Sequence, residues 1–224
     1  MHSDSLAAAA AGPTRASARA RRLQILEATL RVMARDGLRA VTHRGVAAEA
    51  GVPLSATTYY FRDLDDLLAE SFLHWSRGQQ ALMDAFQAAA SQRVAALREH
   101  SAAPAEIAAA VARIAAAYVV DQVRRQRDDR VLEFAFLHEA VRNPRLGTVV
   151  GAHLQGQLGF LERFHAGLGS TQPAVDAQLA HGLLLGLEKA ALLGASPSDE
   201  EERIRGALDL HLRRALGPGD GPGL

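Results

Sequence analysis

Apolar residues recur every three or four positions along most of the chain, and this spacing is typical of amphipathic α-helices. The first stripe predicts a helix from about residue 18 to residue 36 and consists of Leu23, Leu26, Leu30 and Met33. Gly37 can adopt the left-handed conformation that ends a helix, and Thr42 is a suitable N-cap for the next one. The pattern then predicts two short helices, at about 43–50 and 54–60, joined by a Gly-Val-Pro turn.

A long helix follows these short ones. Asp63 is its predicted N-cap, and its apolar stripe runs from Leu64 to Phe86. Beyond it, breaks that contain Pro or Gly next to helix-capping residues separate five further helices, expected at about 104–126, 129–142, 147–168, 173–194 and 199–216. No run of alternating β-branched residues stands out, so the sequence predicts an all-α protein.

The same pattern divides the chain into four segments. Residues 1–17 are rich in Ala and residues 217–224 are rich in Gly and Pro, so both are expected to be disordered, because they hold too little apolar surface to pack. Residues 18–63 hold the three N-terminal helices, and residues 64–216 hold the long helix and the five that follow it. We expect these two central segments to form separate domains.

The amino-acid composition excludes several classes of functional site. The 224-residue chain is 48% hydrophobic, 22% charged and free of cysteine, which excludes disulfides, thiolate metal sites and cysteine nucleophiles. Its nine histidines are scattered without a metal-binding spacing, and no phosphate-binding or nucleophile motif occurs. We therefore expect no catalytic residue, metal or cofactor. The chain also shows no signal peptide and no long apolar run, so we expect a cytoplasmic protein without a membrane partner.

The charge is unevenly distributed although its sum is zero. Residues 1–62 contain nine Arg and four acidic residues, a net charge of +5, whereas residues 63–224 contain sixteen basic and twenty-one acidic residues, a net charge of −5. A basic N-terminal segment on an acidic body points to a nucleic-acid partner for the basic part.

The stretch "GVPLSATTYYF" at residues 51–61 indicates which kind of nucleic acid the basic segment binds. Two short helices joined by a glycine-containing turn, after a longer helix, form the pattern of a helix-turn-helix. Its second helix, residues 54–60, would enter the major groove of double-stranded DNA. The Ser, Thr and Tyr hydroxyls of this helix can donate to phosphate oxygens or base edges.

The stretch "TLRVMARDGLRAVTHRGVAAEAGVPLSATTYYFRDLDDLL" resembles the N-terminal domain of the TetR family of transcriptional regulators. The match covers roughly residues 20–68 and includes Gly37, Thr42, Val46, Ala47, Ala50, Gly51, Val52, Tyr59, Phe61 and Leu67. One departure concerns the lysine that usually opens the fourth helix and touches a phosphate, because Leu64 stands there. Arg62 or Arg44 could take its place.

The resemblance implies a division of roles among the polar residues of the helix-turn-helix. Those expected to hold phosphates are Thr42, Arg44, Tyr59 and Tyr60, with Arg62 as the possible substitute for the lysine. Ser55, Thr57 and Thr58 are expected to lie closest to the bases. Packing is the alternative for each residue: one tyrosine could belong to the core, and Thr58 could bond its own helix.

For the body, the resemblance implies a small-molecule effector and a homodimer. The side chains expected to line the effector site are mostly aromatic, and a cavity among them would suit a hydrophobic or amphipathic molecule. They are Phe72, Trp75, Phe86, Tyr118, Phe134, His138, Gln157 and Phe160. Glu139 and His153 are further polar candidates if they point inward. Ordinary core packing is the alternative for most of this set.

The helix at 173–194 is apolar on more than one face and carries small residues at Ala180, Gly182 and Gly186. Such a helix needs a second partner, so it could pair with 147–168 in a four-helix bundle between two subunits. Burial inside a monomer is the alternative. Together these features predict a repressor that leaves a palindromic operator when its effector binds. A DNA-binding protein without an effector and an all-α enzyme are the other possibilities.

Overall fold

The computed structural model describes residues 15–194 and 199–217. Within these ranges the chain forms nine α-helices and one short 3-10 turn, without any strand, which confirms the predicted all-α class. The helices are α1 (Arg15–Asp36), α2 (His43–Ala50), α3 (Leu54–Tyr60), α4 (Leu64–Glu99), α5 (Pro104–Arg125), α6 (Arg127–Ala140), α7 (Pro144–Leu168), α8 (Pro173–Leu192) and α9 (Glu200–Leu216).

Two predicted helix starts, those of α2 and α4, are confirmed by side-chain caps. The Thr42 hydroxyl accepts a hydrogen bond from the Gly45 amide at 3.0 Å, and the Asp63 carboxylate accepts one from the Asp66 amide at 2.7 Å. At the N-terminus, α1 begins at Arg15 rather than at about residue 18. The rest of the predicted disordered arm, residues 1–14, and residues 218–224 of the predicted tail lie outside the described residues.

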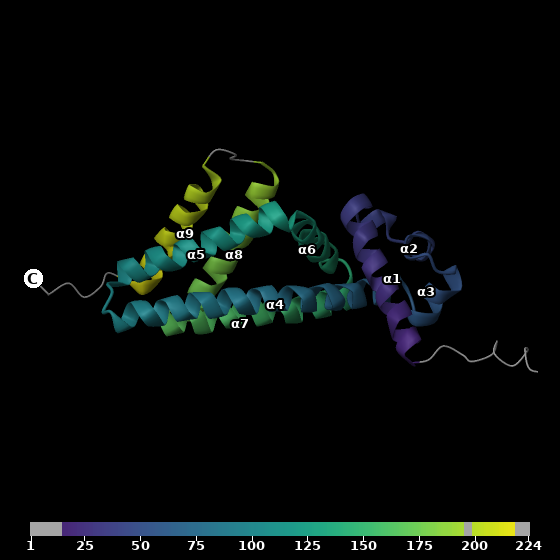
Figure 1. Cartoon of the computed structure of the whole chain (residues 1–224), viewed down its shortest axis with the longest axis horizontal. Coiled ribbons are helices and arrows are strands. Elements are labelled where there is room, and N and C mark those ends of the chain that lie inside the picture. The colour runs from purple at the N-terminus through teal and green to yellow at the C-terminus, as the bar shows by residue number, and fades with distance from the viewer. Residues whose placement is uncertain (1–14, 195–198, 218–224) are drawn as a thin grey trace, which may run out of the picture.

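The first three helices form a head at one end of the molecule (Figure 1). Gly51 ends α2 with a left-handed backbone (φ 63°, ψ 35°), which lets the chain turn sharply into α3. The apolar core of the head includes Ile25, Leu26 and Phe61 and continues without a break into α4 and α6. The division into separate domains at residue 63 therefore stays a prediction.

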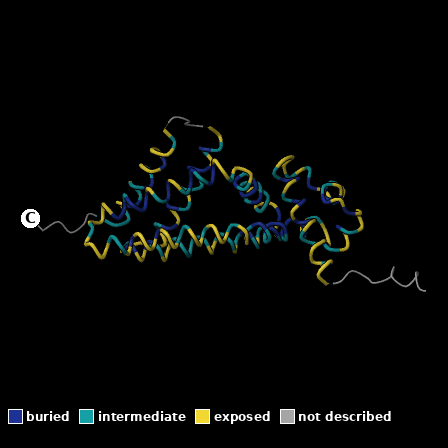
Figure 2. The backbone as a smooth tube through the Cα atoms, in the orientation of Figure 1, coloured by how far each residue is buried: buried dark blue, intermediate teal, exposed yellow. Residues whose placement is uncertain are grey.

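The remaining helices, α4 to α9, form the body. Helices α4 and α7 lie side by side along its length, and α7 packs on α8 while α5 packs on α9 (Figure 1). Buried residues gather in two places, under the head and where α5 meets α9 (Figure 2). No helix in the described ranges is both long and apolar enough to cross a membrane.

Ion pairs and hydrogen bonds tie the start of α4 to the start of α7. The Arg145 guanidinium lies 2.7 Å from the Asp63 carboxylate, and the Asn143 amide donates to Asp65 at 2.8 Å. Arg62 donates to Asp66 at 3.0 Å. The hydrogen bond from Arg62 is the main reason that the pKa of Asp66 is held below its usual range. The corner at which the head meets the body is therefore anchored by several charged contacts.

Candidate recognition helix and internal cavity

Helix α3 exposes one polar face. Ser55, Thr58 and Tyr59 are all exposed, and 81% of Tyr59 is accessible to solvent. The Thr58 hydroxyl donates to the Ser55 carbonyl at 3.2 Å, which leaves the lone pairs of its oxygen free to accept a hydrogen bond. A large aromatic side chain that stays this exposed contributes little to packing, so this face is the candidate surface for a partner.

Thr57 lies on the opposite face and corrects the sequence prediction. Its side chain is fully buried, and its hydroxyl donates to the Leu54 carbonyl at 2.8 Å. It therefore cannot reach a base edge. Tyr60 is half-buried against the core of the head, with its ring 5.0 Å from that of Tyr59 in an edge-to-face arrangement. Only the outer part of Tyr60 is available to a ligand.

Thr42 and Arg44 are exposed at the N-terminal end of α2, where the helix dipole favours an anion. Arg62 is exposed as well, but it is already bonded to Asp66 through both its backbone amide and its guanidinium. In the described part of the chain, the head arginines without an ion pair are Arg15, Arg19, Arg21, Arg39 and Arg44. Within the described ranges, five of the nine head arginines are thus free for phosphates, and the other four are already engaged with carboxylates.

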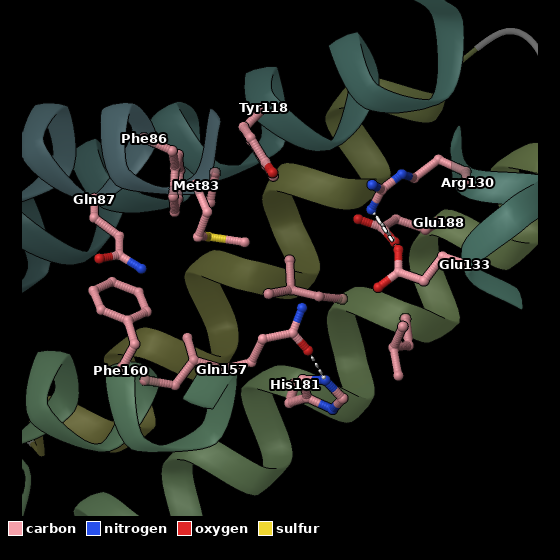
Figure 3. A pocket seen from close by; sticks show the side chains of 14 residues that line it. Met83, Phe86, Gln87, Tyr118, Arg130, Glu133, Gln157, Phe160, His181 and Glu188 are labelled. Carbon is pink, nitrogen blue, oxygen red and sulfur yellow. Dashed lines mark hydrogen bonds and ion pairs between the residues drawn. The ribbon is translucent and has the colours of Figure 1, made fainter. Parts of the chain in front are cut away.

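A cavity of about 80 Å³ lies inside the body, with walls from α4, α5, α6, α7 and α8 (Figure 3). It is lined by Met83, Phe86, Gln87, Ala115, Tyr118, Arg130, Glu133, Gln157, Phe160, Leu161, His181, Leu184, Leu185 and Glu188. Its two ends differ in chemistry. Phe86 and Phe160 lie toward one end, whereas Arg130, Glu133 and Glu188 gather at the other. The cavity is therefore amphipathic along its length.

The charged end holds two carboxylates and one guanidinium, each 6–7% exposed. Arg130 Nη1 donates to Glu133 Oε2 at 2.6 Å, while Glu188 Oε2 lies 3.9 Å from the same nitrogen. Arg130 Nη2 donates to Gln79 at 3.2 Å, and its Nε has no hydrogen-bond partner among the described residues. Burial raises the pKa of Glu188 to about 7, the charge of Glu133 adds to the shift, and Arg130 opposes it.

A chain of three polar side chains forms the wall between these ends. His181 Nε2 and Gln157 Oε1 are 3.2 Å apart, and Gln157 Nε2 lies 3.2 Å from His153 Nε2. Burial lowers the pKa of both histidines, so both rings are neutral at neutral pH. The amide then donates to His153 and accepts from His181, which assigns the proton to Nε2 of His181 and to Nδ1 of His153.

A smaller cavity of about 30 Å³ adjoins the first, and Met83, Tyr118, Arg130, Glu133 and Gln157 line both. Trp75 and His153 line the smaller one. Trp75 Nε1 donates to the Asp129 carboxylate at 2.9 Å, which links α4 directly to α6. The residue after Asp129 is Arg130, so this link ends at the charged end of the main cavity.

The structure brings some of the predicted effector-site residues together and removes others. Phe86, Tyr118, Gln157 and Phe160 line the main cavity, and Trp75 lines the smaller one. Three of the predictions need correction. Phe72 is buried against the rings of Trp75 and Phe136, Phe134 is half-buried and lines neither cavity, and His138 is exposed. The reason is that α6 beyond Glu133 leaves the cavity and packs against α1.

Several lining residues were not foreseen, among them Arg130, Glu133, His181 and Glu188. One signal for Glu188 was present in the sequence. It is a single acid within the apolar run "LLLGLEKAALL", where a carboxylate on a buried helix should face either a counter-ion or a cavity. Among the described residues, no group of three or more His, Asp or Glu side chains is arranged to hold a metal ion.

The raised pKa of Glu188 predicts a pH-dependent stability. Because the unfolded side chain titrates near its ordinary value of 4.5, the folded state holds the extra proton between about pH 4.5 and pH 7. Stability should therefore fall as the pH rises through this window and then level off. Glu188→Gln cannot ionise, so at pH 8 it should be more stable than the parent protein by up to about 3 kcal/mol.

Urea unfolding between pH 5 and pH 8 measures this difference. The groups that face Glu188 are Arg130 and Glu133 on α6, Tyr118 on α5, His153 on α7 and His181 on α8, and the variant leaves all of them in place. Glu99→Gln, an exposed carboxylate at the end of α4, is the matched control and should follow the parent at every pH. Parallel curves for Glu188→Gln and the parent would contradict the prediction.

Known proteins resemble this chain over both halves. The family model for bacterial regulatory proteins of the tetR family matches residues 25–71, and the model described as "Tetracyclin repressor-like, C-terminal domain" matches residues 103–217. Among curated relatives, the regulator BetI of Burkholderia cenocepacia (strain HI2424) is 34% identical over 79 residues, 35% of this chain and 38% of BetI. PksA of Bacillus subtilis (strain 168) is 47% identical over 49 residues, 22% of this chain and 24% of PksA.

These alignments span less than two-fifths of either relative, whereas the similar solved structures extend over nearly their full length. The multidrug binding protein EbrR complexed with ethidium is 30% identical, with a TM-score of 0.59 over 85% of this chain and 98% of EbrR. A TetR-family member from Streptomyces coelicolor A3 is 28% identical, with a TM-score of 0.60 over 85% of this chain and 97% of that one. Because a family model matches more than half of the chain and a second one matches the helix-turn-helix, the protein belongs to the TetR family of bacterial transcriptional regulators.

Proposed function

We propose that the protein is a homodimeric repressor that leaves a palindromic operator when a small hydrophobic or amphipathic effector enters the cavity. The observation that carries the proposal is the position of the cavity between α4 and α6. These two helices also pack directly against α1 of the head (Figure 1). A molecule that pushes either helix outward must therefore shift the head.

Contacts along α4 connect the cavity to the core of the head and can transmit that shift. Met83 and Phe86 place the middle of α4 in the cavity, and Trp75, farther toward the head on the same helix, belongs to the core of the head. Trp75 also donates to Asp129, beside the cavity residue Arg130. Effector binding would thus favour a different spacing of the two α3 helices of the dimer and reduce the population that fits the operator.

The size of the cavity supports this view of the switch. A volume of about 80 Å³ is smaller than the ~300 Å³ or more of sites for drug-sized ligands, so such a ligand must displace side chains. Met83, which lines both cavities, has a flexible thioether that can move at little cost. EbrR, which has a similar fold, is described as a multidrug binding protein in complexes with ethidium and malachite green.

The exposed side of α8 supports the homodimer. Val175 and Leu179 are 49% and 57% exposed, and Gly182 and Gly186 continue the same stripe at helical spacing. A Cβ atom added to either glycine would meet open space, so packing within the chain does not require these glycines. Small and apolar residues on one stripe suit the close approach of a second helix, as in a two-fold helical bundle.

An effector should stabilise the folded protein and lower its affinity for DNA, because effector binding and DNA binding are coupled. A screen of hydrophobic and amphipathic molecules by thermal shift should yield ligands that raise Tm, because they bind only the folded state. Each should lower operator affinity about 5–150-fold. Trp75 is the only tryptophan and lines the adjoining cavity, so its fluorescence should change as well.

Phe160→Ala should reduce the affinity of these ligands while DNA binding without ligand stays unchanged. Leu158→Ala, half-buried on the same helix but not lining the cavity, is the control. The operator is first located by footprinting on DNA that flanks the gene. Ligands that stabilise the protein but leave DNA affinity unchanged would show that the cavity is not a switch.

The exposed face of α3 predicts two different kinds of DNA-binding defect. Tyr59→Phe removes one exposed hydroxyl, so it should weaken binding to all operator variants by a similar factor if that hydroxyl holds a phosphate. Thr58→Val should instead change the order of preference among variants. Thr57→Val is the matched control, because its buried hydroxyl should affect stability and not this order. If Thr57→Val reorders the variants and Thr58→Val does not, the assignment of faces is wrong.

The stripe on α8 predicts a two-fold dimer that one charge can disrupt. Leu179→Arg places a guanidinium in the proposed contact and should give monomers in sedimentation experiments without DNA, because an unpaired charge is costly to bury. Leu210→Arg on α9, where the leucine is 54% exposed, is the control and should remain dimeric. A monomeric parent protein, or a dimeric Leu179→Arg, would rule out this interface.

A further inference from the structure

We propose that the effector of this cavity is a cationic aromatic molecule whose positive charge is held by Glu188, beside Glu133. The inference rests on the proposed function for the role of the ligand, and it adds the charge and shape of that ligand. It comes from the number of charged groups at the charged end of the cavity and from their distances to one another.

The two carboxylates share a single guanidinium, and they share it unequally. Arg130 Nη1 is committed to Glu133 at 2.6 Å, and Nη2 is used by Gln79 at 3.2 Å. Glu188 stands 3.9 Å from Nη1, beyond hydrogen-bond distance, although only 6% of it is exposed. A buried carboxylate without a close partner is unfavourable, so this position has room for one more positive charge.

The other groups at the cavity wall do not supply that charge. Among the described lining residues, Arg130 is the only Arg or Lys. Burial lowers the pKa of His181 and of the nearby His153, so both are neutral at neutral pH, and burial raises the pKa of Tyr118 to about 12. An anionic ligand would add a third negative charge beside the two carboxylates. A cation would leave the cluster neutral.

The opposite end of the cavity determines the rest of the ligand. Phe86 and Tyr118 contact each other with their ring centroids 4.6 Å apart and their planes tilted by 35°, and Phe160 faces them across the cavity (Figure 3). Aromatic rings and a thioether favour a flat apolar skeleton, and the ring faces also attract positive charge. The cavity therefore suits a cation carried at one edge of an aromatic ring system.

This arrangement couples ligand binding to a proton. With its pKa near 7, Glu188 is partly protonated in the empty cavity at neutral pH. A cation favours the ionised carboxylate, so binding should release a proton when the pH is below 7. The affinity for a permanent cation should then rise almost tenfold per pH unit up to about pH 7 and level off above it. A neutral ligand should show no such dependence.

Ethidium and 5-methylphenanthridinium are suitable permanent cations, and phenanthridine, the uncharged parent ring system of both, is the neutral counterpart. Titrations without DNA at pH 5.5, 6.5, 7.5 and 8.5 should give the rising curve for the two cations and a flat curve for phenanthridine. At pH 8.5, Glu188→Gln should lower the affinity for both cations at least tenfold and remove their pH dependence. Phenanthridine should bind to this variant as it binds to the parent.

Glu99→Gln removes one exposed negative charge and serves as the matched control, with unchanged affinities. Thermal unfolding checks that Glu188→Gln is folded. The proposal is overturned if neither cation binds, if both bind Glu188→Gln as tightly as the parent, or if the anion 1-anilinonaphthalene-8-sulfonate binds more tightly than they do. Operator release is measured separately: cations that bind through Glu188 without releasing DNA would leave this inference intact and contradict the proposed function.

Discussion

The aromatic cluster of Phe72, Trp75 and Phe136 joins the head and the adjoining part of the body into one packed unit. Its ring centroids lie 5.3–6.0 Å apart, and the cluster is continuous with the core beneath α1 and α2. A close-packed interior contains little empty space. Helices that share a core therefore tend to change between discrete arrangements rather than deform gradually. The position of α3 is therefore tied to the positions of α4 and α6, which also form walls of the cavity.

Charged residues have opposite effects on stability in the head and in the body. In the head, Arg31 and Arg35 pair with Glu49 of α2, and Arg22 pairs with Glu70 of α4, so part of the basic character is used to hold α1 against its neighbours. In the body, two carboxylates are buried with one guanidinium, an arrangement that a core built only for stability would avoid. The ion pairs of α1 make the head more rigid but leave fewer arginines for DNA. The buried carboxylates give the cavity a charged wall but lower the stability of the protein.

The helices themselves could be predicted from the sequence within a few residues. A helix depends on contacts between residues three or four positions apart, and its N-cap side chain bonds an amide two or three positions away. Thr42 and Asp63 satisfy both conditions, so the starts of α2 and α4 were readable from local sequence. The match to the helix-turn-helix has the same origin, because that motif consists of consecutive helices and their turns.

The sequence by itself thus determined the all-α class, the order of the helices and the family, because each is encoded in local patterns. Tertiary structure decided which face of each helix is covered. It buried Thr57, turned His138 to solvent, and brought Glu188 to Arg130 from 58 positions away. Periodicity defines an apolar face but does not say which distant element will cover it, and a cavity exists only where several distant elements fail to fill the space between them.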